Sequence, residues 1–180
     1  MPSVVSVNVG LPQTVAWHGE AVTTGIFKTP AVGPVRVAYL NLEGDRQADL
    51  TVHGGKDKAV YAYPSEHYEY WRAVLPQRLD VWGAFGENLT SAGLDEETIA
   101  VGDRLRIGNA VFEVTQPRIP CYKLALRFAD ESMVKRFLQS RRTGFYLRVI
   151  EEGELHAGDP VDHIAHGSIT IADVLRKEFD

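Results

Sequence analysis

The sequence predicts a mainly β protein of the α+β class, in which short strands form a closed or nearly closed barrel and a few helices lie at its periphery. Apolar and polar side chains alternate in several short segments, which is the period-2 pattern of strands. Gly and Pro recur between these segments, with 16 glycines and 9 prolines in 180 residues. Many short strands punctuated in this way are typical of a barrel.

The strand assignments rest on local pattern. Val5, Val7 and Val9 alternate with polar residues, and Ala59–Tyr63 is a β-branched and aromatic run that favours a strand. Gly108-Asn109 and Glu152-Gly153 are turn signals, so we expect a hairpin at each. The expected strands are 4–9, 35–42, 59–63, 105–107 paired with 111–115, and 145–151 paired with 155–156.

Three helices are expected, each opened by a capping side chain. Their apolar residues recur at helical spacing, and Gly144 is placed to end the second helix. The last helix is short, so it must dock on the barrel or on a partner. The expected helices are residues 66–75 capped by Ser65, residues 131–142 capped by Asp130, and residues 171–179 capped by Thr170.

Composition narrows the class of protein. The formal net charge is −5 with no basic tract, which argues against nucleic acid as a partner. No apolar run approaches the roughly 20 residues that a membrane helix needs, so no membrane partner is expected. The single cysteine and the absence of a signal peptide at the start predict a cytoplasmic protein.

The single cysteine, Cys121, lies in a segment that also contains Pro117, Arg118, Pro120 and Lys123. Proline stiffens a loop, and nearby cations favour the thiolate form of a cysteine. One thiol cannot form an intramolecular disulfide. The local segment therefore leaves three roles open for Cys121, namely packing as a small apolar side chain, nucleophilic attack and metal ligation.

A long polar segment, residues 43–58, separates two expected strands. Its His53-Gly54-Gly55-Lys56 stretch could form a nest of backbone amides beside a cation, which is an anion site. The spacing is not that of a Walker loop. A solvated surface connection is the alternative, although connections longer than about 12 residues are more often functional or disordered.

Other polar residues are less informative on their own. The segment 83–90 contains Gly83 and Gly86 around Phe85, which suits either a tight turn with a buried ring or a close approach of the backbone to a ligand. The local sequence around Lys28 by itself indicates a surface lysine. The six histidines lack zinc-protease spacing and cysteine partners. We expect His156, His163 and His166 to be solvated.

Six segments in the same order resemble the MOSC domain, and within it the stand-alone bacterial YiiM-like subfamily. The resemblance covers about residues 25–160 of a predicted domain at 1–165. Residues 166–180 are then a short helix, the remnant of a longer helical tail in that subfamily, so the tail is either reduced or truncated. The matching segments are 25–30, 42–49, 53–61, 83–89, 101–103 and 116–121.

This resemblance implies a MOSC-type β-barrel that binds the molybdenum cofactor (molybdopterin). Cys121 then corresponds to the sulfur ligand of molybdenum, and a soft thiolate suits that metal. The phosphate of the pterin would be held by the His-Gly-Gly-Lys loop and nearby cations. A pyridoxal phosphate label also accompanies the family. The implied cofactor-binding residues are Asp45, Gln47, His53, Gly54, Gly55, Lys56, Gly86, Glu87, Asn88, Arg118 and Cys121.

The resemblance also implies reduction of small N-hydroxylated compounds, such as N-hydroxylated bases, to amines. The implied catalytic residues are Cys121 and three proton donors, His53, Glu43 and Lys28. Electrons would come from a separate flavoprotein reductase, because one cysteine cannot hold an iron–sulfur cluster. Two alternatives stay open, a sulfur carrier with a persulfide on Cys121 and a cofactor-binding module without turnover. A homodimer is also left open.

Overall fold

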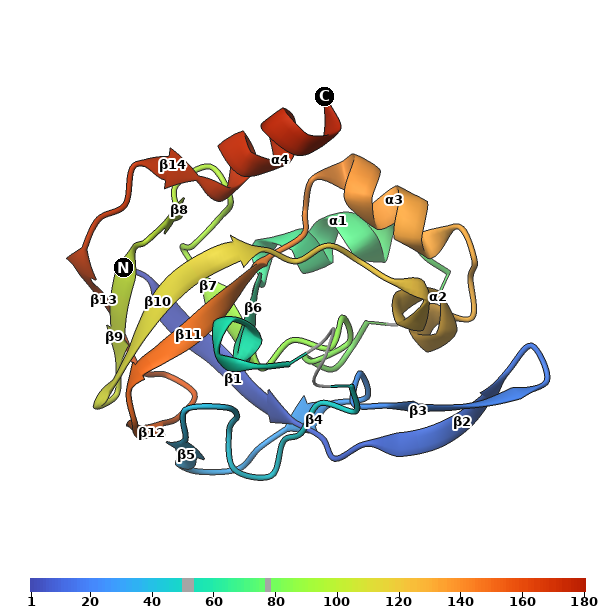
Figure 1. Cartoon of the computed structure of the whole chain (residues 1–180), viewed down its shortest axis with the longest axis horizontal. Coiled ribbons are helices and arrows are strands. Elements are labelled where there is room, and N and C mark those ends of the chain that lie inside the picture. Colours follow the sequence, from blue (N-terminus) through green and yellow to red (C-terminus); the bar gives the residue numbers. More distant parts are fainter. Residues whose placement is uncertain (50–53, 77–78) are drawn as a thin grey trace.

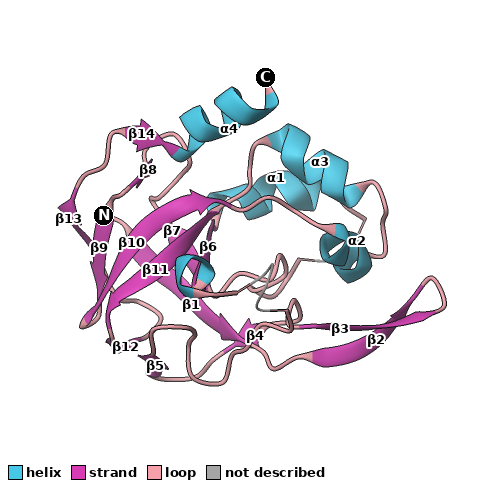
Figure 2. Ribbon diagram, viewed as in Figure 1, coloured by secondary structure: helices cyan, strands magenta, loops and turns pink. Residues whose placement is uncertain are grey.

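Short strands carry the fold, and four α-helices in the described part of the chain lie around them (Figure 1 and Figure 2). The computed structural model describes residues 1–49, 54–76 and 79–180. The mainly β class with peripheral helices is confirmed. The helices are α1 (Glu66–Val74), α2 (Tyr122–Phe128), α3 (Met133–Ser140) and α4 (Ile171–Phe179), with a 3-10 turn η1 (Lys56–Lys58).

The largest sheet of the described chain has eight strands in the order β13-β9-β10-β11-β6-β7-β1-β4. Its pairs are antiparallel except for the parallel pair β6 and β7. These strands are β1 (Ser3–Val9), β4 (Thr29–Pro30), β6 (Val60–Pro64), β7 (Leu89–Ala92), β9 (Arg104–Ile107), β10 (Ala110–Pro117), β11 (Phe145–Glu151) and β13 (Val161–Ala165).

The expected closure into a barrel is not confirmed. Among the described residues no strand ladder joins the two edges of the large sheet, β13 and β4. Backbone bonds do tie the start of β1 to the chain around the start of β13: the Val161 amide donates to the Pro2 carbonyl at 2.9 Å, and the Val4 amide donates to the Asp159 carbonyl at 2.9 Å. Three small two-stranded sheets complete the described strands. They pair β2 (Gln13–Trp17) with β3 (Glu20–Thr24), β5 (Val35–Val37) with β12 (Gly153–Leu155), and β8 (Ala100–Val101) with β14 (Ile169–Thr170).

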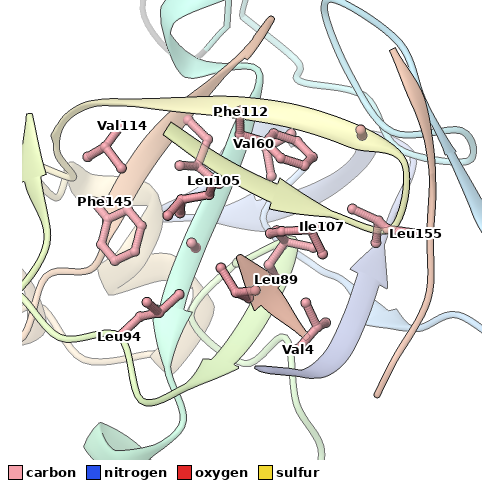
Figure 3. Packing of buried hydrophobic residues seen from close by; sticks show 14 of the residues in the cluster. Val4, Val60, Leu89, Leu94, Leu105, Ile107, Phe112, Val114, Phe145 and Leu155 are labelled. Atoms are coloured by element: carbon pink, nitrogen blue, oxygen red, sulfur yellow. The ribbon is translucent and has the colours of Figure 1, made fainter. Parts of the chain in front are cut away.

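The inner face of the large sheet holds the main hydrophobic core (Figure 3). Its side chains are the inward residues of the alternating strands, for example Leu105 and Ile107 of β9, which are buried between the exposed Arg104 and Arg106. Removal of this apolar surface from water is the main force that holds the strands together. The cluster also contains Val4, Val60, Leu89, Leu94, Phe112, Val114, Phe145 and Leu155.

A second core is mostly aromatic and lies under α1, α2 and α3. Tyr68 and Trp71 are buried on one face of α1, as the helical spacing indicated, and Leu75 is buried directly after the end of the helix. Trp71 donates its indole N–H to the Tyr63 hydroxyl at 2.8 Å, so the polar ends of these rings are satisfied inside the core. This second core supports one wall of the site described below.

Two strand predictions were wrong. Residues 155–156 do not form a hairpin with 145–151, because β12 pairs with β5 instead. The expected strand 35–42 ends at Val37, and the chain turns back so that Leu42 bridges to Val37. Tyr39 and Leu40 are 54% and 51% exposed at this reversal. The apolar residues after Val37 therefore do not line a buried sheet face.

The first two predicted helices are found near their expected positions, but their predicted side-chain caps are not. Ser65 precedes α1 but makes no side-chain cap bond, and the helix expected at 131–142 is confined to α3. Asp130 accepts from the Ser132 amide at 2.9 Å, one turn before α3. The helix α2 was not predicted, because its short, proline-flanked segment reads as a loop.

The last helix follows the prediction closely. The Thr170 hydroxyl accepts from the Asp173 amide at 3.1 Å, which is the expected cap of α4. Ile171 and Leu175 of α4 belong to the main core, so the helix docks on the sheet. No helix in the described part of the chain has the length and apolar character needed to cross a membrane.

Candidate functional site

A cleft opens beside the aromatic core, where segments far apart in the sequence meet. Its floor comes from β6 and β11, and its walls come from the loops before β4, before η1 and before β7 and from the segment that leads into α2. The thiol of Cys121 lies at this cleft together with cations and two phenols. The described lining residues are Thr24, Gly25, Ile26, Lys28, Arg46, Gln47, Ala48, Lys58, Tyr61, Gly86, Asn88, Arg118, Cys121, Lys123 and Tyr146.

Strand pairing places the phenols and Asn88. Tyr146 of β11 is the register partner of Tyr61 of β6, and their ring centroids are 5.4 Å apart. The Asn88 side chain accepts from the Tyr61 amide at 3.0 Å and donates to the Asn8 carbonyl at 3.3 Å. Asn88 therefore fixes the end of the loop before β7 against β6 and β1.

Glycine allows two walls of the cleft to approach each other. A Cβ at Gly25 would lie 2.4 Å from the Arg46 carbonyl oxygen, so only glycine lets the segments around these residues touch. Gly86 has φ +83°, and its Cβ would lie 2.8 Å from Ile26 Cγ1. Gly86 also closes a turn by donating to the Gly83 carbonyl at 3.0 Å. The predicted tight turn with a buried Phe85 is confirmed, and its Gly86 lines the cleft.

Arg118 is a buried cation at the base of the cleft. Its Nη1 donates to the Phe85 carbonyl at 3.0 Å and to the Tyr61 hydroxyl at 3.3 Å, and its guanidinium lies over the Tyr61 ring at 4.8 Å. Burial lowers the pKa of Arg118, but the phenolic oxygens of Tyr61 and Tyr146 outweigh it, so the net pKa is raised. Arg118 is therefore a fixed positive charge that faces the site.

The same environment keeps the phenols protonated. Burial raises the pKa of Tyr61 above its ordinary value, and Arg118 only partly opposes this. Burial likewise raises the pKa of Tyr146, again against the effect of Arg118. The Tyr61 hydroxyl donates to the Thr143 carbonyl at 2.6 Å. Both phenols are therefore neutral groups at physiological pH.

Lys28 is not the surface lysine that its local sequence suggested. Its Nζ lies 2.6 Å from Asp45 Oδ1, and the two side chains are 7% and 0% exposed. Asp45 Oδ1 also accepts from the Gly10 amide at 2.9 Å. Asp45 Oδ2 is buried with no hydrogen-bond partner in the described protein, so Asp45 retains acceptor capacity beside Lys28.

Cys121 is half-buried and is the residue immediately before α2. Its backbone is extended, with φ −123° and ψ 179°, and its carbonyl accepts from the Leu124 amide at 2.9 Å. Cys121 lines the cleft together with Arg118 and Tyr146, and its charge contributes to raising the pKa of both. The thiol is thus presented to the cleft and not packed inside a core.

The charge of the cleft is strongly one-sided. Five of the described lining residues are cations, and none of the described lining residues carries a carboxylate. Asp45 is engaged by Lys28 behind the surface of the cleft. This arrangement suits an anionic ligand in a chain whose overall charge is −5. The cations are Lys28, Arg46, Lys58, Arg118 and Lys123.

The structure brings about half of the predicted site residues together at the cleft. Those that line it are Lys28, Gln47, Gly86, Asn88, Arg118 and Cys121, and Asp45 lies directly behind Lys28. Glu43 and Lys56 are exposed outside the lining, and Gly54 and Gly55 are also not among the lining residues. His53 lies outside the described residues, so its predicted role stays a prediction.

Glu87 is buried under the loop before β7 and does not line the cleft. Burial raises the pKa of Glu87, and hydrogen bonds from Tyr68 and the backbone oppose that shift. Its Oε1 accepts from the Tyr68 hydroxyl at 2.5 Å and from the Gly83 amide at 2.9 Å, and its Oε2 accepts from the Phe85 amide at 3.1 Å. Glu87 therefore shapes the loop from behind.

Sequence reasoning did not assign several residues of the cleft. Lys123 carried a signal, because it was recognised as a cation close to the cysteine. Lys58 and Arg46 lie inside the matched segments next to residues that were assigned. Tyr61 ends the matched segment 53–61 and Tyr146 lies outside every matched segment; neither was assigned, because only the register of β6 and β11 decides which face of each strand they occupy.

Comparison with known proteins decides the family. The MOSC domain model matches residues 49–162. The chain belongs to the MOSC family. This MOSC protein is 48% identical to the protein YflK of Bacillus subtilis (strain 168) over 165 residues, which is 92% of this chain and 74% of YflK.

Two further similarities define its place in the family. The crystal structure of YiiM from Geobacillus stearothermophilus superposes with a TM-score of 0.81 at 36% identity, over 99% of this chain and 84% of that one. A protein named "Reductase" from Gibberella moniliformis (strain M3125 / FGSC 7600) is 36% identical over 146 residues, which is 79% of this MOSC chain and 26% of the fungal protein. The predicted resemblance to YiiM-like MOSC proteins is confirmed.

Proposed function

We propose that this MOSC protein binds the molybdenum cofactor in the cleft and reduces small N-hydroxylated compounds to amines. The observation that carries the proposal is the grouping of one half-buried thiol with five cations and no carboxylate among the described lining residues. The cofactor is an anion with a phosphate at one end and a sulfur-bound molybdenum at the other. A thiolate ligand and a set of cations are the protein groups that match those two ends.

The residues divide into two roles toward the cofactor. Cys121 would ligate molybdenum, and Arg118, Lys58 and Lys123 would hold the negative pterin and its phosphate. Arg118 suits this role because its guanidinium is already fixed by Phe85 and Tyr61, so little conformational entropy is lost on binding. When bound, the cofactor supplies two-electron redox chemistry at the metal.

Proton supply falls to the protein. Reduction of an N-hydroxylated group breaks the N–O bond, consumes two electrons and two protons, and releases water. Lys28 is the one of the three predicted proton donors that the described structure places at the cleft, and Asp45 holds its ammonium group in position. The electrons would come from an external flavoprotein reductase. The name of the Gibberella relative agrees with a reductase but specifies no substrate.

The experiment is a reduction assay with the cofactor-loaded chain, a chemical reductant and an N-hydroxylated base. We expect the amine to accumulate with the wild-type chain and not with Cys121→Ala. A loaded sample that is inert toward several N-hydroxylated substrates contradicts the reductase proposal and leaves a binding module. A mass gain of one sulfur atom on Cys121 in metal-free protein favours the sulfur carrier, which the half-buried, accessible thiol also suits.

A further inference from the structure

A second group of metal-ligand side chains lies away from the cleft, around Asp103, His163 and His166. Each offers one ligand atom, and these atoms all lie within 4.8 Å of one another. Asp103 precedes β9, His163 belongs to β13, and His166 follows β13. Figure 1 shows β9 and β13 on the left and α2 to the right of the sheet, and none of the three residues lines the cysteine cleft.

Asp103 is held by the backbone on both sides. Its side chain is 2% exposed; Oδ1 accepts from the Gly167 amide at 2.6 Å, and Oδ2 accepts from the Ala100 amide at 2.9 Å. Each carboxylate oxygen has a further lone pair. Hydrogen bonds of this kind orient a ligating carboxylate in metal sites.

The two imidazoles converge on the same carboxylate. His163 Nε2 lies 2.9 Å from Asp103 Oδ2, and the centroids of the His163 and His166 rings are 4.1 Å apart. His163 and His166 are exposed residues, as the sequence suggested, but they lie together beside Asp103. The His163 side chain is 27% exposed against Asp103, and the exposed His166 ring lies beside it at a tilt of 36°.

We propose that Asp103, His163 and His166 bind a divalent transition-metal ion of the zinc class. Two imidazole nitrogens and one carboxylate oxygen suit such an ion, whereas Mg²⁺ and Ca²⁺ prefer oxygen ligands alone. A His163 ring that donates from Nε2 to Asp103 shifts that proton to Nδ1 on binding, so Nε2 becomes a ligand. Water completes the coordination.

The site ties the end of the chain to the sheet. The segment after β13 leads to β14, which pairs with β8, and then directly to α4. Asp103 lies between β8 and β9. A metal that joins Asp103 to His163 and His166 therefore fastens the connection that positions α4 on the main core, and we expect it to stabilise the folded state.

The test is zinc binding to the full chain by equilibrium dialysis, with Mg²⁺ in a parallel measurement. We expect about one zinc ion per wild-type chain and at least about tenfold weaker affinity in His166→Ala, because loss of an outer-shell partner alone weakens metal sites 10- to 100-fold. His166 is exposed, so this variant retains its core. Zinc should also raise the Tm of the wild type by more than it raises that of His166→Ala at the same concentration.

Two control variants make the result specific. His156→Ala removes a surface histidine that lies 3.2 Å from Asp159, a His–Asp pair outside the three-ligand group. Cys121→Ala removes the thiol of the cleft. Both should bind zinc at this site as the wild type does. Zinc binding that is equal in His166→Ala and wild type, or absent in the wild type, overturns the proposal.

Discussion

At the scale of single residues, the site depends on side chains that are fixed before any ligand arrives. Arg118 is held by Phe85 and Tyr61, and Lys28 is held by Asp45. Sequence motifs identified Arg118 and Cys121 correctly as neighbours, because they lie three positions apart. Tyr61 and Tyr146 could not be found in this way, since their meeting depends on strand register.

The two lysines of η1 are predicted to differ in their contribution to cofactor binding. Lys58 lines the cleft, whereas Lys56 is exposed outside the lining. A charge-assisted contact is worth about 1.5 kcal/mol or more, so Lys58→Ala should weaken cofactor retention about tenfold. Lys56→Ala is the matched control and should retain the cofactor as the wild type does. The measurement is the pterin content of protein purified from a cofactor-competent host.

That comparison also tests the role of the His-Gly-Gly-Lys loop. The sequence placed the phosphate near Lys56, and the described geometry favours Lys58. Equal loss in the two variants would mean that the phosphate lies over the loop and not inside the cleft.

At the scale of elements, pattern predicts most strands and helices but not how they pair. The alternation in β9 and β10 gave a correct hairpin because the pairing is local. The partner of β12 is β5, about 118 residues earlier in the chain, and local pattern carries no information on so distant a partner. The seven-residue α2 was missed because prolines at 117 and 120 mask its start.

The loop before β7 offers a test of how tightly the cleft wall is packed. Gly86 and Gly55 both have positive φ, +83° and +86°, but an added Cβ meets Ile26 at 2.8 Å only at Gly86. With φ 86° and ψ 174°, Gly55 lies in a region that almost only glycine adopts, so we expect Gly55→Ala to lower the free energy of unfolding by about 1–3 kcal/mol through backbone strain alone. Gly86→Ala should cost about 1–3 kcal/mol more through overpacking.

Urea unfolding of the two variants measures that difference. Equal losses of stability would show that the approach of Ile26 to the Gly86 turn is loose.

At the scale of the whole molecule, the fold contains two hydrophobic cores with different roles. The aliphatic core holds the sheet, and the aromatic core beside α1, α2 and α3 carries one wall of the cleft. The sequence predicted the mainly β class and the docking of the last helix. Closure of the sheet into a barrel is not confirmed, and local pattern cannot predict it, because closure depends on the edge strands β13 and β4, which are distant in sequence.

The buried phenols predict alkaline unfolding. Burial raises the pKa of Tyr61, Tyr63, Tyr68 and Tyr146 above the ordinary value near 10. Above that pH the unfolded chain binds fewer protons than the folded chain, so stability falls as pH rises, by about 1.4 kcal/mol per pH unit for each such tyrosine. Below that pH the contribution is fully present.

Absorbance at 295 nm and circular dichroism followed together against pH check this expectation. Phenolate absorbance from these four tyrosines should appear with the loss of the circular dichroism signal. Ionisation of every tyrosine in a chain that keeps its folded spectrum would contradict the burial of these groups.

The central claim is that the thiol of Cys121 holds molybdenum in the cationic cleft. Its most direct test is the molybdenum content of protein expressed in a cofactor-competent host, for wild type, Cys121→Ala and Tyr122→Ala. Tyr122 is the exposed neighbour of Cys121 and does not line the cleft. We predict about one molybdenum per chain in wild type and Tyr122→Ala, and loss of the metal in Cys121→Ala. Molybdenum retained in Cys121→Ala at the wild-type level would contradict the claim.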